Sequence, residues 1–188
     1  MCFSVNLKED VMSNFIDRVI RASKLDSKVF EEVEADYGAM AQAVGIVVLS
    51  SIAAGIGTFS TGGIGGIVFG FIAALVGWLV WSFLTYYIGT RLLPEPETKA
   101  DYGELLRTIG FASSPGLIRV LGLIPWISNI VFIVAGIWML VAMVIAVRQA
   151  LDYKSTLRAI GVCIIGWIIQ AAVIFLLLWV FGIPLKPS

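Results

Sequence analysis

The sequence predicts an all-α membrane protein, a helical bundle with about five transmembrane spans that follows short amphipathic helices. Three observations support this fold class. Of the 188 residues, 59% are hydrophobic and 14% are charged, and the mean hydropathy is +0.96, unlike soluble domains. Residues 64–90 carry no charged side chain, and about 20 apolar residues suffice to cross a bilayer. The apolar runs are also continuous, whereas a transmembrane β-barrel needs short alternating segments.

Residues 1–38 are expected to form a cytoplasmic amphipathic segment. It is mixed in charge and precedes the first apolar run, so it does not resemble a cleavable signal peptide. Two apolar stripes at helical spacing predict two short helices: Phe15, Ile16, Val19 and Ile20 in the first, and Leu25, Val29, Phe30 and Val33 in the second. Ser13 and Asp26 are the candidate N-caps. We expect these helices to lie along the membrane surface or against the loops of the bundle.

The second of these helices is acidic. Its carboxylates are Glu31, Glu32, Glu34 and Asp36. A solvated helix face explains such a cluster, and so does a surface that docks a partner protein. The negative charge disfavours binding to anionic lipid headgroups.

Residues 39–188 are predicted to form the transmembrane domain. Its five spans cover about 40–58, 64–90, 102–124, 128–147 and 157–181. Small residues at four-residue spacing run into the second span: Gly62, Gly66, Gly70 and Ala74. Such spacing lets two helix backbones approach closely, so it predicts a tight hairpin of the first two spans around a glycine-rich turn.

The third span is predicted to be broken. Asp101 and Glu104 have the spacing of a capping box at its start. At Ser113, Ser114 and Pro115 the helix must kink or end, because proline lacks the backbone donor. Ser114 could then cap a second half-helix with Pro115 at its first position.

Two interpretations of this break remain open. Discontinuous helices can build substrate or ion sites within a membrane, and Gln170, the strongly polar residue of the last span, would join Ser113, Ser114 and Pro115 there. Alternatively, the break is a packing kink whose freed carbonyls bond to the serines, and Gln170 makes an interhelical hydrogen bond. Near the far end of the third span, Arg119 could extend to the interface.

The distribution of basic residues predicts the orientation. With five spans, most of the 13 Lys and Arg residues fall on the side of the N-terminus, and they include Arg91, Lys99, Arg148, Lys154 and Arg158. The positive-inside rule then places the N-terminus in the cytoplasm and the C-terminus outside.

The composition also restricts the chemistry. The sequence contains no histidine, which removes Ser-His and Cys-His nucleophile pairs, His-rich zinc sites and His-ligated haem. Cys2 and Cys163 are too few for a disulfide framework. The formal net charge is zero, so nothing favours nucleic acid. We therefore expect no catalytic residue, no metal and no cofactor.

Three stretches resemble the Yip family, the Ypt/Rab-interacting integral membrane domain, and in particular its prokaryotic branch. They are FIDRVIRASKLDSKVFEEVEADYGAMAQA, YGELLRTIGFASSPGLI and IWMLVAMVIAVRQALDYKSTLRAIGVCIIGW. The resemblance implies a five-span bundle with a cytoplasmic N-terminus and no defined catalytic residues. Eukaryotic members are linked to vesicle trafficking and Rab GTPases, but the short N-terminal segment here gives no reason to expect Rab binding.

The sequence thus favours a non-enzymatic scaffold or accessory subunit in a prokaryotic cytoplasmic membrane. Its partners would be the lipid bilayer and other membrane proteins or further copies of itself. A small transporter or channel that uses the broken third span is the alternative. An intramembrane enzyme is disfavoured, since no nucleophile-and-base pair or metal-ligand set is present.

Overall fold

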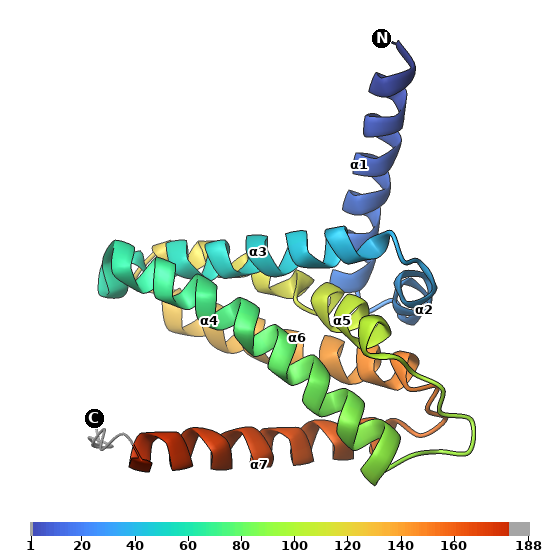
Figure 1. Ribbon diagram of the computed structural model, residues 1–188. Helices are drawn as coiled ribbons and strands as arrows, with labels where there is room; N and C mark the ends of the chain where they lie inside the picture. Colours follow the sequence, from blue (N-terminus) through green and yellow to red (C-terminus); the bar gives the residue numbers. More distant parts are fainter. Residues whose placement is uncertain (1, 181–188) are drawn as a thin grey trace.

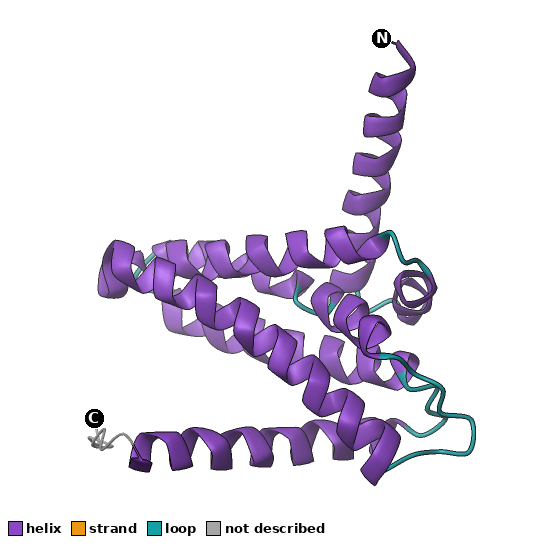
Figure 2. Cartoon of the chain, viewed as in Figure 1, coloured by secondary structure: helices purple, strands orange, loops and turns teal. Residues whose placement is uncertain are grey.

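The computed structural model describes residues 2–180, with side-chain surroundings for all of these except residues 2–11, 60–62, 66, 174 and 176–180. Every regular element in this part of the chain is a helix (Figure 2), as predicted. In chain order the elements are α1 (Cys2–Ser23), α2 (Ser27–Ala35), α3 (Ala39–Gly57), α4 (Phe59–Tyr87), the π-helical η1 (Ile88–Leu92), α5 (Tyr102–Phe111), the 3₁₀-helical η2 (Ser114–Leu123), α6 (Ser128–Ala150) and α7 (Thr156–Val180).

The two N-terminal helices are present, but the predicted start of the first is wrong. α1 runs through Ser13 without a break, so this residue is not an N-cap. Asp26 does cap α2, since its carboxylate accepts a hydrogen bond of 3.0 Å from the Lys28 backbone amide. α1 extends away from the bundle and crosses the direction of α3 (Figure 1), whereas α2 buries Val29, Phe30 and Val33 against the bundle.

Four of the five predicted spans are helices long and apolar enough to cross a membrane. Within the described residues they are Ala39–Gly57, Gly63–Leu92, Ser128–Ala150 and Thr156–Val173. The first two form the predicted hairpin. The chain reverses between Gly57 and Gly63, where Gly63 adopts a φ of +56°, a left-handed conformation that glycine tolerates best.

The remaining predicted span is broken, as expected. The capping box of Asp101 and Glu104 opens α5, which ends at Phe111, and η2 follows as a 3₁₀ helix with proline in its first turn. Ser114 is not the cap of the second half, because it is the first residue of η2 and Ser113 precedes it without a side-chain capping bond.

The serines at the break bond to carbonyls that the helix leaves free. The Ser114 hydroxyl donates to the Phe111 carbonyl oxygen at 2.7 Å, and the Ser113 hydroxyl reaches the Ile109 carbonyl oxygen at 3.5 Å. The packing interpretation of the kink therefore has direct support. Neither half alone has the length of a spanning helix.

α5 and η2 together nevertheless run the length of α3 and in the same direction. Gly110 packs on Ala43, Gly116 meets Ser50, and Gly122 lies against Gly57. Later residues of the broken segment contact later residues of α3, so the broken segment passes between the same two ends of the bundle as α3 does. Sequence analysis did not identify these three glycines.

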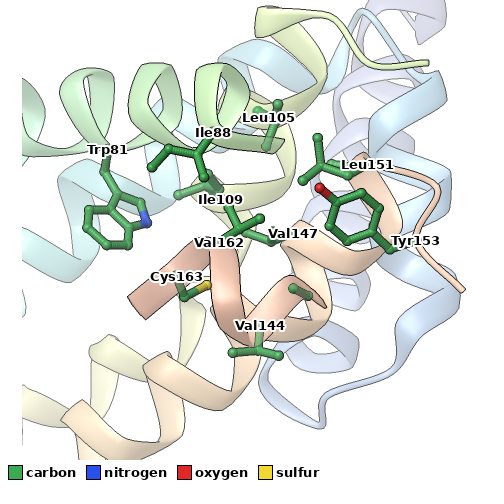
Figure 3. Close-up of a cluster of buried hydrophobic side chains, with 12 residues drawn as sticks. Trp81, Ile88, Leu105, Ile109, Val144, Val147, Leu151, Tyr153, Val162 and Cys163 are labelled. Carbon is green, nitrogen blue, oxygen red and sulfur yellow. The ribbon is translucent and has the colours of Figure 1, made fainter. Parts of the chain in front are cut away.

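Buried side chains concentrate at the end of the bundle that holds the two long loops. One cluster joins α4, α5, α6 and α7 around Trp81, Leu105, Val147 and Tyr153 (Figure 3). A second cluster packs α1 and α2 against α3, α6, and the end of α5 with the turn that follows it. The buried residues of α7 lie in its first half, at Ala159, Val162, Cys163 and Gly166, and none of residues 167–173 is buried. The bundle is therefore closed at the loop end and more open at the other.

Candidate functional site

A cavity of about 470 Å³ lies inside the bundle between α3, α4, η2, α6 and α7. Its polar lining comes from Ser50, Ser51, Thr58, Ser113, Arg119 and Gln170. Its apolar lining includes Trp78, Trp81, Trp167, Met139 and Met143. The volume is in the range of small-molecule sites.

The cavity brings together two of the four residues of the predicted broken-helix site. Ser113 and Gln170 both line it, from the break and from α7. Ser114 and Pro115 are buried in η2 but do not line the cavity. Gln170 makes no hydrogen bond to another described residue, so the structure does not contain the interhelical bond expected for it within that part of the chain.

Arg119 is a residue of this cavity that the sequence did not predict there. Its side chain lines the cavity, and its Nε atom is buried without a hydrogen-bond partner among the described residues, while its expected reach to the membrane interface stays a prediction. The guanidinium carbon lies 5.9 Å from the centre of the Phe132 ring. In the sequence Arg119 stands alone, because no other charged residue occurs between Arg107 and Arg148, but this isolation does not show what the side chain contacts.

The small residues of α4 also face this cavity. Gly70, Ala74 and Gly77 line it, and a Cβ atom at Gly70 or Gly77 would have no neighbour within 4 Å. Contact with α3 is made at Gly55, which packs on Ile67. The surroundings of Gly62 and Gly66, the first two residues of the predicted packing stripe, lie outside the described residues.

The acidic helix α2 is tied to α1 by ion pairs. Glu32 pairs with Arg18 at 2.7 Å and with Arg21 at 2.8 Å, and Asp36 pairs with Arg18 at 2.8 Å. Arg18 is buried, and bonding to it lowers the pKa of the Asp36 carboxyl. At least two of the four predicted docking carboxylates therefore contact their own chain.

The other two carboxylates face α6 and the loop that follows it. Glu31 accepts a hydrogen bond from the Gln149 amide. Burial, and then the charges of Asp152 and Glu104, raise the pKa of Glu34 to about 7. This glutamate sits where α2 meets α5 and the loop between α6 and α7.

One protein-family model matches most of the chain. It is the model of the Yip1 domain, and it matches residues 27–182. This protein belongs to the Yip1 family. No curated protein and no solved structure matches the chain.

The Yip1 match begins at the first residue of α2 and includes all the helices that line the cavity. α1 lies entirely before it. Membership of this family, with the long apolar helices described above, establishes an integral membrane protein in contact with lipid.

The chemistry of the Yip1 domain is limited by its residue types. Among the described residues no group of three or more His, Cys, Asp or Glu side chains could hold a metal ion. Cys163 is a buried free thiol, and Cys2 lies where side chains are not described. What the cavity offers is hydrogen-bond donors and one cation.

Proposed function

We propose that this Yip1-domain protein is a non-enzymatic membrane scaffold or accessory subunit that binds other membrane proteins through α1. Three apolar residues carry this proposal. Met12, Ile16 and Ile20 follow one another at four-residue spacing, which places them on one face of the helix, and they are 58%, 50% and 47% exposed.

α1 is held firmly enough to present that face. Arg18 and Arg21 pair with α2, the Trp138 indole donates to the Ser23 carbonyl oxygen at 2.8 Å, and Phe15 approaches Gly45 of α3. An anchored helix with an unburied apolar stripe favours an interaction surface. We propose that the carboxylates of α2 border this surface.

We further propose that residues 1–38 and both long loops are cytoplasmic and that the C-terminus lies outside, in a prokaryotic cytoplasmic membrane. Lys154 pairs with Glu97 and Arg158 pairs with Glu95, so the two loops lie together at one end. That end collects most of the basic residues, in agreement with the positive-inside rule.

The test is mild detergent extraction from native membranes through a C-terminal tag, followed by native mass spectrometry. The scaffold proposal expects foreign membrane subunits or further copies in fixed stoichiometry. Ile16→Lys should release them, whereas Asn14→Lys, which places the same charge on another face of α1, should not. Retention of every partner by Ile16→Lys would refute α1 as the docking surface.

Transport is the second candidate, and the polar cavity at the broken span favours it. If Pro115→Ala and Gln170→Leu abolish a solute flux in proteoliposomes while the protein remains folded, the scaffold proposal loses to transport.

A further inference from the structure

Arg119 is a half-buried cation that lines the cavity and has no counter-ion among the described residues. Its Nε atom is buried and unpaired within the described residues, and no carboxylate in that part of the chain forms an ion pair with it. An unpaired charge at such a position is costly, and within a membrane it marks a functional site. The cost falls if an anion from outside the chain occupies the cavity.

Two further donors line the same cavity without a hydrogen-bond partner in the described part of the chain. Ser50 is 4% exposed, and neither its hydroxyl nor the Gln170 amide has a side-chain hydrogen bond to another described residue. A guanidinium, an amide and a hydroxyl are groups that bind the oxygens of a phosphate. The polar part of the cavity therefore suits an oxyanion.

The rest of the space is apolar and larger than a phosphate requires. Three tryptophans and two methionines complete the cavity of about 470 Å³. A second, apolar groove of about 530 Å³ runs between α6 and α7 and shares Met139, Met143 and Trp167 with the cavity. Trp167, which lines both spaces, is 57% exposed, so the cavity and the groove meet at the surface of α7.

The position of Arg119 along the span also suits a lipid. Its backbone carbonyl lies against Gly57, the last residue of α3, so the cation is close to one end of the membrane-spanning segment. A headgroup belongs at that depth, and the apolar groove continues from the shared Met139, Met143 and Trp167 to Thr156, at the loop end of α7.

We propose that this cavity binds an anionic phospholipid, with the phosphate at Arg119 and an acyl chain along the groove between α6 and α7. The charged headgroup matches the polar lining of the cavity, and the acyl chain matches the apolar lining of the groove. This site goes beyond the scaffold function, and it is separate from the stripe on α1.

The test uses the full chain in mild detergent, titrated with dioleoyl phosphatidylglycerol, dioleoyl phosphatidylcholine or sodium phosphate. Tryptophan fluorescence reports binding, since three indoles line the cavity, and native mass spectrometry counts retained lipids. We expect phosphatidylglycerol to bind at least about tenfold more tightly than phosphatidylcholine, and Arg119→Gln to weaken it by about 10- to 100-fold. Arg91→Gln, the same change at an exposed arginine, should have no effect.

Two variants test the cavity and the groove without altering charge. Gly77→Leu fills the cavity from a position with no neighbour within 4 Å, and Gly136→Phe does the same in the groove. Both variants should bind phosphatidylglycerol more weakly than the unmodified protein does. If Arg119→Gln does not fold, these two variants decide the question.

Three results would overturn the proposal. Equal binding of the two lipids, unaffected by Arg119→Gln, would remove the anion site. Binding of free phosphate as tight as that of phosphatidylglycerol, with the same dependence on Arg119, would indicate a small-anion site. An equal loss in Arg91→Gln would reduce the effect to general surface charge.

Discussion

Replacing Arg107 by methionine should release the C-terminal turn of α2 from the bundle. The Arg107 side chain is 2% exposed. Its Nε donates to the Val33 carbonyl oxygen at 3.0 Å, Nη2 donates to that of Glu34, and the guanidinium lies 4.9 Å from the Tyr37 ring centre. The last four carbonyls of a helix lack partners within it. Arg107 of α5 therefore supplies the C-terminal cap of α2.

The size of the effect follows from these contacts. Each hydrogen bond to a charged group contributes about 1.5 to 3 kcal/mol, although water can replace the bond to the half-buried Glu34 carbonyl. The contact with Tyr37, which is 78% exposed, adds only about 0.5 to 1 kcal/mol. A loss of about 3 kcal/mol corresponds to on the order of 100-fold in the opening equilibrium.

Hydrogen exchange with mass spectrometry measures that equilibrium in detergent-solubilised protein. Peptides covering α2 should lose on the order of 100-fold in protection in Arg107→Met. Arg107→Lys, which keeps the charge but not the fork of donors, should lose less, and Arg91→Met should lose none. Unchanged protection of α2 in Arg107→Met would refute the capping argument, and so would an equal loss throughout α5, which would mean that α5 itself unfolds.

Three further predictions concern pH, packing and a loop. Burial, and then neighbouring carboxylates, raise the pKa of Glu34 from 4.5 to about 7; the folded state then binds this proton more tightly, so the stabilisation is full below pH 4.5 and is lost as pH rises through 7. In Glu34→Gln the thermal unfolding temperature should vary less with pH across that window. If it varies with pH as much as in the unmodified protein, Glu34 is not the group responsible. Gly116→Ala should destabilise the bundle by about 1 to 3 kcal/mol, because the added Cβ would overlap the Ser50 hydroxyl. The control is Gly136→Ala, whose added Cβ meets nothing within 4 Å. It should leave the thermal unfolding temperature unchanged. Tyr153→Phe removes a hydroxyl placed 2.9 and 2.7 Å from two carbonyl oxygens near the end of the second span, and it should cost about 1 to 2 kcal/mol, read as faster hydrogen exchange in residues 88–93.

The features that could be predicted from the sequence are those with local causes. Long uncharged runs fix the spans, and the caps at Asp26 and Asp101 act within a few residues of themselves. The break before Pro115 is also local, since proline removes a donor wherever it occurs. Ser13 failed as a cap because capping residues also occur inside helices, and nothing in the neighbouring residues marks the difference.

The contact between α3 and the broken span could not be predicted, because the spacing of the contacting glycines changes at the break. The packing stripe predicted for the second span used the four-residue spacing of regular helices. Gly116 and Gly122 are instead six residues apart, which is two turns of a 3₁₀ helix. Gly110 belongs to α5, before the break. Only knowledge that η2 is a 3₁₀ helix places Gly116 and Gly122 on the same side as Gly110, the side that faces α3.

The two arginines of the broken span show why the cavity also escaped prediction. In the sequence Arg107 and Arg119 are alike, each a single cation among apolar residues. Tertiary contacts distinguish them, because α2 gives Arg107 two carbonyl oxygens, whereas no described carboxylate or carbonyl bonds to the Arg119 guanidinium. A cation that is satisfied by a helix end stabilises the fold. For Arg119, which is left unpaired beside unbonded donors, we propose that an anion from outside the chain is the partner. On this argument Arg107→Met should change stability, while Arg119→Gln should change lipid affinity more than stability.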